Sequence, residues 1–223
     1  MFQKKKTNQS TPFEKTLLSR LVNYKPLLTV IFELIDHNLL YNARIVATRV
    51  ITSVARLTEQ YQPRTPSIVG FLGSEAKYLV KKCLFRLQRF ESEELRISIL
   101  DLISTTVEIQ RGLSELFLNL SLNSKEEEEK NSDLTIIKEF TSSSSSDKGI
   151  LPEKGCVETI LTILSEPTKG SSKVILSSLN VLQCIFERGE HKQITDILRN
   201  DDKFWKIILK TLSNRNPEIQ SIT

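Results

Sequence analysis

The side chains in this sequence that most often take part in chemistry are three cysteines and two histidines. Cys83, Cys156 and Cys184 are too few and too widely spaced for a disulfide framework, and their spacing matches no zinc-binding pattern. They fall on apolar helix faces, so we expect small buried residues of a reducing compartment with inert thiols. Neither His37 nor His191 belongs to a metal-binding His or Glu pair, and the sequence predicts no metal site. Both histidines lie near predicted helix ends, where a solvated or capping side chain is expected.

No pattern in the chain brings a nucleophile, a base and a stabilising group together. Gly73-Ser74-Glu75 lacks the preceding strand and the second glycine of a nucleophile elbow, and a helix N-cap accounts for Ser74. No glycine-rich phosphate-binding or dinucleotide-binding pattern occurs. The sequence therefore predicts that the chain is not an enzyme and holds no cofactor.

One polar pattern could form a binding surface. Tyr78, Lys82, Arg86 and Arg89 recur at helical spacing, which places them on one face of a helix. Residues 1–120 hold 17 Lys and Arg against 11 Asp and Glu, so this face could attract an acidic partner or a phosphate backbone. Charges opposite an apolar stripe are more often simply the solvated face, and a net charge of +4 is small for a nucleic-acid binder. We keep the four residues as a candidate partner-contact surface and expect no direct nucleic-acid binding and no small-molecule substrate.

The elements that must position these residues are predicted to be helices. Hydrophobic residues make up 39% of the chain and recur at helical spacing, whereas no segment shows the two-residue alternation of a strand. No apolar run approaches the roughly 18 residues of a membrane span. Caps and proline or glycine turns predict helices beginning at or near Pro12, Pro26, Asn42, Pro66, Ser74, Ser92, Leu113, Val157, Ser171, Ile194, Asp201 and Asn216.

The width of the apolar faces indicates how the helices pack. In the helix from Ser92, Leu95, Ile99 and Leu102 form one apolar stripe, and a second stripe lies beside it. A helix with so broad an apolar arc packs against neighbours on two sides, as in stacked helix pairs. We predict an all-α, right-handed α-solenoid of stacked antiparallel helix pairs of the HEAT or armadillo kind, with Leu102 and Leu182 buried. Because the helix spacing is irregular, a compact helical bundle is the alternative.

The chain is predicted to divide into three parts. Residues 121–149, with four consecutive glutamates and five consecutive serines, contain too little apolar surface to offset the entropy of ordering them. We predict a disordered loop there, between helical repeat segments at residues 1–120 and 150–223. A helix beginning at Asn216 would be too short to be stable without support, so the second segment is predicted to be truncated. An exposed stacking surface is then expected at Trp205, Ile208 and Leu212.

Several runs of residues are more distinctive than the general helical leucine pattern. The most distinctive run is Pro66–Ala76, which contains Gly70-Phe71-Leu72-Gly73-Ser74-Glu75-Ala76. The others are Glu94–Ile97 and Gln110–Leu118, with Leu182 and Lys203–Trp205 after the serine-rich insertion. Together these runs resemble the largest inner-ring scaffold nucleoporins of the nuclear pore complex. The likeness covers most of residues 45–120 and 150–212, and the serine-rich insertion lies outside it.

This resemblance implies a scaffold role. Such nucleoporins are long α-solenoids that hold the inner ring together by binding short helical segments of linker nucleoporins, and they are not enzymes. The resemblance therefore implies an internal fragment of a nuclear pore protein at the nuclear envelope, with other pore proteins as partners. A soluble armadillo-like adaptor or transport receptor that binds linear peptides is the alternative. The presence of one tryptophan, Trp205, counts against the Asn and Trp ladders that many such adaptors use.

Overall fold

The structure is a computed structural model that describes residues 27–37, 41–60, 67–89, 92–119, 155–166, 171–188 and 191–213. Within these ranges the regular elements are α-helices and one 3-10 turn, with no strand, which confirms the all-α prediction. The helices predicted from Pro12 and Asn216, and the loop predicted at residues 121–149, lie outside the described residues. No helix in the described part is long and apolar enough to cross a bilayer.

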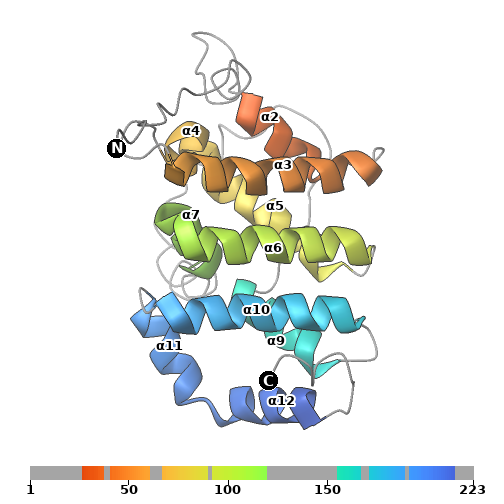
Figure 1. Cartoon of the computed structure of the whole chain (residues 1–223), viewed down its shortest axis with the longest axis vertical. Helices are drawn as coiled ribbons and strands as arrows, with labels where there is room; N and C mark the ends of the chain where they lie inside the picture. Colours follow the sequence, from red (N-terminus) through yellow and green to blue (C-terminus); the bar gives the residue numbers. More distant parts are fainter. Residues whose placement is uncertain are drawn as a thin grey trace, which may run out of the picture.

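Figure 1 shows the arrangement of the described helices. Their bounds are α2 Leu27–Leu34, α3 Tyr41–Gln60, α4 Ile68–Leu72, η1 Gly73–Glu75, α5 Ala76–Gln88, α6 Glu93–Ile109, α7 Arg111–Asn119, α9 Cys156–Ser165, α10 Ser172–Arg188, α11 Lys192–Arg199 and α12 Asp202–Ser213.

Three long helices lie side by side in one layer. Helix α6 packs against α3 on one side and α10 on the other, and Figure 1 shows the three stacked along the long axis of the molecule. Helices α5, α7 and α9 lie behind them and pack against one another. The helices before residue 120 and those after residue 154 therefore share one core, which runs from Leu28 to Phe204.

Side-chain caps fix several helix starts as the sequence predicts. Ser92 Oγ accepts a hydrogen bond from the Leu95 amide at 3.3 Å, which opens α6. Ser171 Oγ accepts from the Val174 amide at 3.4 Å before α10. Asp201 Oδ1 accepts from the Lys203 amide at 2.9 Å before α12. Each bond satisfies a donor that the first turn of a helix leaves unpaired.

Several predicted helix starts differ from the observed starts by one or two residues, among them those of α3, α5 and α7. Ser74 does not cap α5, because it lies inside the 3-10 turn that Gly73 begins at a φ of +59°, and the Ala76 amide donates to Gly73 O. Asn42 lies inside α3, which begins at Tyr41. The helix predicted to begin at Leu113 begins two residues earlier, at Arg111, and includes Gly112. A Cβ at Gly112 would lie 3.4 Å from the Val69 side chain of α4, which is an ordinary van der Waals contact.

The core is built around α6. Leu102 and Leu182 are 0% and 4% exposed, which confirms the predicted burial of both. Ser98 and Ser104 are also buried on α6, and such small side chains let neighbouring helices approach closely. At the end of α6, Gln110 Nε2 donates to the Ala55 carbonyl of α3 at 3.1 Å. This bond fixes the corner between α6 and α7 against the neighbouring long helix.

Candidate interaction surfaces

The three cysteines are buried, as the sequence predicts. Burial raises the pKa of the Cys83 thiol to about 12, and the nearby charge of Asp36 adds to the shift. Burial raises the pKa of Cys156 to about 12 as well. Burial, together with a hydrogen bond to Glu108, raises the pKa of Cys184 to about 11. All three therefore stay protonated at neutral pH, and a protonated thiol is a poor nucleophile.

The two histidines differ in their surroundings. His37 is exposed after α2, in line with the expected solvated side chain. For His191 that expectation is wrong: the residue is 9% exposed, and its Nε2 lies 3.2 Å from Ser114 Oγ of α7. Its side chain makes no capping bond to α11. His191 is therefore buried in contact with α7, although its position at a helix end suggested a solvated side chain.

The predicted basic stripe on α5 contains an ion-pair cluster centred on Asp36. After α2 ends, the Asp36 amide donates to Glu33 O at 3.1 Å, and this turn brings Asp36 to α5. Arg86 Nε donates to Asp36 Oδ1 at 2.6 Å, and its Nη2 donates to the Asp36 carbonyl at 2.8 Å. Lys82 Nζ lies 3.2 Å from Asp36 Oδ2. Arg86 is buried, so this cluster attaches the end of α2 to α5.

The rest of the stripe is more open. Tyr78 is 54% exposed, and the Lys82 ammonium lies 4.7 Å from its ring centre. Burial alone would lower the pKa of Lys82, but hydrogen bonds to Tyr78 and Asp36 outweigh it and raise the pKa. Arg89 is exposed, with its guanidinium 4.3 Å from the Phe85 ring centre. The structure thus separates Tyr78 and Arg89, which face solvent, from Arg86, which does not. Contact of this stripe with a partner stays a prediction.

Helix α12 carries the second predicted surface. Trp205 and Leu212 are 43% and 40% exposed, whereas Ile208 is half-buried against the core. Trp205 is held in place because its Nε1 donates to the Arg199 carbonyl at 2.9 Å. Leu209, which the sequence analysis did not single out, is 64% exposed. It follows Trp205 by four residues, so helical spacing alone could have added it. We call Trp205, Ile208, Leu209 and Leu212 the α12 surface.

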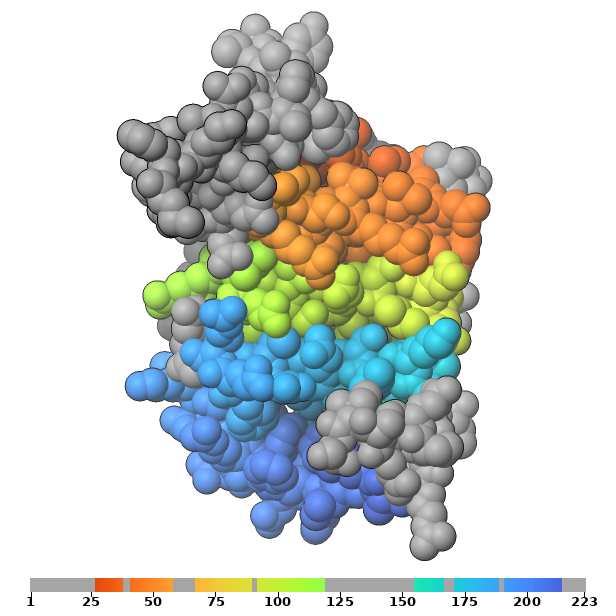
Figure 2. Space-filling model, in the orientation of Figure 1, coloured from red at the N-terminus to blue at the C-terminus, as the bar shows by residue number. Residues whose placement is uncertain are grey.

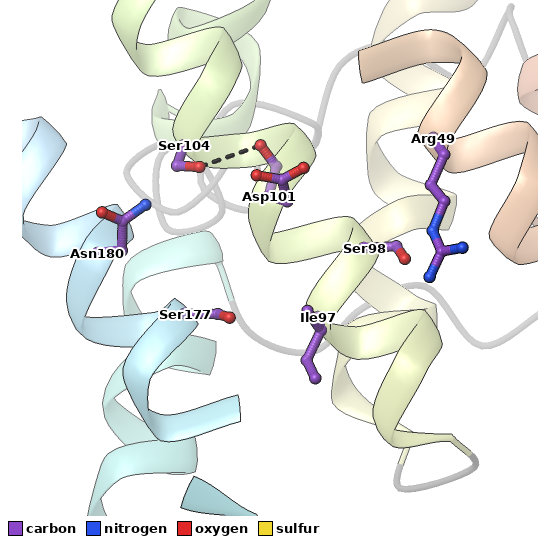
Figure 3. Close-up of a pocket in the computed structure, with 7 residues that line it drawn as sticks. All are labelled: Arg49, Ile97, Ser98, Asp101, Ser104, Ser177 and Asn180. Carbon is purple, nitrogen blue, oxygen red and sulfur yellow. Dashed lines mark hydrogen bonds between the residues drawn. The ribbon is translucent and has the colours of Figure 1, made fainter. Parts of the chain in front are cut away.

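A third feature, which the sequence analysis missed, is a polar hollow across the three long helices. It has a volume of about 290 Å³ and is lined by residues of α3, α6 and α10, the helices that run side by side on the face drawn in Figure 2. Figure 3 shows how its side chains come from all three helices. The residues that line this three-helix hollow are Arg49, Ile97, Ser98, Asp101, Ser104, Ser177 and Asn180. They are scattered over about 130 positions of sequence, so no local motif marks them.

In the part of the chain that the structure describes, the regular elements are helices packed in layers, and the candidate sites are exposed surfaces of these helices. The family model described as "Nucleoporin Nup188, N-terminal subdomain III" matches residues 3–121, more than half of the chain. The chain therefore belongs to the Nup188 nucleoporin family, which confirms the resemblance seen in its sequence. Membership assigns it to the nuclear pore complex at the nuclear envelope.

A curated relative shows the same kinship. Nucleoporin NUP188 of Xenopus tropicalis is 26% identical over 151 residues, in a match that covers 66% of this chain. The chain spans about 8% of the length of that relative.

Proposed function

We propose that the chain is a structural scaffold segment of the inner ring of the nuclear pore complex, where it supports pore assembly and nucleocytoplasmic transport without catalysing a reaction. The observation that carries this proposal is the packing of α6 between α3 and α10. A helix buried on both sides makes a layer that can be extended by adding further helices. Membership of the Nup188 family assigns the chain, and with it this layer, to the nuclear pore complex.

The architecture that suits this role is a right-handed α-solenoid of stacked antiparallel helix pairs. Its support is the front layer of α3, α6 and α10 with a second layer of helices behind it (Figure 1). In this proposal residues 1–120 and 150–223 are two stretches of one solenoid, and residues 121–149 are an insertion. The core shared by the described helices on both sides of the insertion supports this division.

The proposed partners are other nuclear pore proteins, in particular linker nucleoporins that contribute short segments. Two surfaces remain proposals for these contacts: the α5 stripe of Tyr78, Lys82, Arg86 and Arg89, and the α12 surface. The first offers cations next to aromatic rings, and the second offers exposed apolar side chains.

A pull-down from nuclear envelope extract with the full chain as bait tests the proposal, with cross-linking and mass spectrometry as the readout. Recovery of inner-ring scaffold and linker proteins is expected. The matched variants are Leu182→Asp, which places a charge in the core shared by the described helices, and Lys173→Glu, an exposed change at the start of α10. The first should lose the partners and the second should keep them. Recovery of cytosolic cargo proteins instead of pore proteins would contradict the scaffold role and favour a peptide-binding adaptor.

A further inference from the structure

Several polar side chains that line the three-helix hollow have no hydrogen-bond or ion-pair partner among the described residues. Within the described part of the chain, no hydrogen bond or ion pair engages the side chains of Ser98, Ser177, Asn180 or Arg49. Figure 3 shows that they come from α3, α6 and α10 and surround the same space. By contrast, Ser104 Oγ donates to the carbonyl of Asp101 at 3.0 Å. Most hydrogen-bonding capacity of the hollow is therefore available to a ligand.

The chemistry of these groups fits a polypeptide backbone with an acidic side chain. An asparagine carboxamide donates and accepts hydrogen bonds, as a peptide unit does, and serine hydroxyls can do either. The Arg49 guanidinium matches a carboxylate, with which it can form two parallel hydrogen bonds. Asp101 has its own counter-charge, because Arg56 lies 3.6 Å away on α3. The hollow therefore retains one cation for the occupant.

The dimensions of the layer set the length of the occupant. Packed helices lie about 8–10 Å apart, so a ligand that crosses from α3 over α6 to α10 spans roughly 16–20 Å. An extended chain rises about 3.3 Å per residue, so five or six residues cover this distance. A nucleic-acid backbone suits the hollow less well, because Asp101 would lie against its phosphates and Arg49 is a single cation.

We propose that the three-helix hollow binds an extended, acidic segment of about six residues from another nuclear pore protein. The segment lies across α3, α6 and α10, with its carboxylate at Arg49 and its backbone at Asn180, Ser177 and Ser98. This inference rests on the proposed function, because the scaffold role supplies the source of the segment.

A peptide array tests the inference. Capped twelve-residue peptides that tile the low-complexity segments of nuclear pore proteins are probed with the full chain, and affinities of the peptides retained are measured by fluorescence anisotropy. Each peptide is paired with a copy in which Asp and Glu are replaced by Asn and Gln. The protein variants are Arg49→Glu, Asn180→Ala and the control Lys173→Glu, which carries the same charge change on α10 outside the hollow. All three positions are exposed, so the fold should survive each substitution.

The expected result is a set of acidic peptides whose affinity falls about tenfold or more with Arg49→Glu or with loss of the peptide carboxylates. Asn180→Ala should weaken them severalfold, and Lys173→Glu should leave them within about twofold. Retention of no peptide, or equal affinity for Arg49→Glu and the original chain, would overturn the inference. Either failure would leave the scaffold role standing if the pull-down still recovers pore proteins, so the two proposals fail separately.

Discussion

Helices α6 and α12 both have amphipathic sequences, yet the fold treats them differently. Residues along the whole length of α6 are buried, including polar ones such as Thr105 and Thr106. In α12 the buried residues are Phe204 and Thr211, and Leu209 is largely exposed. Helix α6 has a long neighbour on each side, whereas α12 packs against α9 and α11. Burial in a layered helical protein therefore depends on the number of neighbours as well as on the apolar pattern.

Leucine truncation should show this difference most strongly. Leu102→Ala removes a fully buried side chain of α6, and we expect a loss of about 2–5 kcal/mol in the free energy of unfolding. Leu209→Ala on α12 is the matched change at an exposed position and should stay within about 0.5 kcal/mol. Urea denaturation followed by circular dichroism measures both. Equal losses would mean that the two helices are packed to a similar degree.

The buried thiols predict an alkaline loss of stability. The pKa of Cys83 and of Cys156 rises from an ordinary value of 9.0 to about 12 on folding. Below pH 9 both states keep these protons, but from about pH 9 to pH 12 the unfolded chain releases them and the folded one does not. Stability should therefore fall with rising pH in that range, by at most about 1.4 kcal/mol per pH unit for each thiol.

Replacing Cys83 and Cys156 by alanine should reduce this alkaline slope, and the part that remains is expected to include Cys184, whose pKa is raised to about 11. Denaturation curves recorded from pH 8 to pH 10, a range of about two units, provide the comparison. An unchanged slope would mean that the thiols already contact water in the folded protein.

The ion-pair cluster on α5 should have a smaller effect than the core leucine. Asp36→Asn removes the charge that faces the buried Arg86 guanidinium, and a loss of about 1–3 kcal/mol is expected. The matched change is Asp196→Asn in α11, the helix before α12. Arg199 lies 3.8 Å from Asp196 there, and both side chains are mostly exposed. That change should cost less than about 0.5 kcal/mol. If thermal melts show the two variants to be alike, the Asp36 cluster does not hold α2 in place.

Local rules account for what the sequence could predict. Ser92 caps α6 because its hydroxyl accepts a hydrogen bond from the Leu95 amide in the first turn, and Leu102 is buried because it lies in the middle of a wide apolar stripe. Both features follow from residues within two helical turns of each other, so spacing alone revealed them. The helix start near Gly73 was harder to predict, because it depends on the positive φ of that glycine and on the 3-10 turn that it begins.

Contacts between distant parts of the chain account for what the sequence could not predict. Asp36 meets Arg86 across 50 positions of sequence, and this contact turns a predicted solvated charge into a buried one. His191 meets Ser114 across 77 positions. The three-helix hollow joins residues from three separate helices in the same way. A single sequence gives the face of each residue on its own helix but does not reveal which other helix lies against that face.

The smallest effect on stability is expected at the α12 surface, where association should change instead. Leu209→Asp should alter the free energy of unfolding by less than about 0.5 kcal/mol but reduce self-association of the chain at high concentration. Val46→Asp on α3 is the control, because Val46 is 58% exposed and Leu209 is 64% exposed. Light scattering over a concentration series distinguishes them. A chain that stays monomeric throughout would mean that the α12 surface does not stack on a second copy.

Hydrogen exchange of the native chain tests most directly whether the helices before and after the 121–149 segment form one stack. We predict that amides in the middle of α6 and α10 are the slowest and open with the same free energy, because the two helices bury each other. Amides of α12 should exchange faster, since one of its faces is open. If α10 instead exchanged together with α12 and independently of α6, the two halves would be separate folding units, and the continuous stack proposed for this scaffold segment would be wrong.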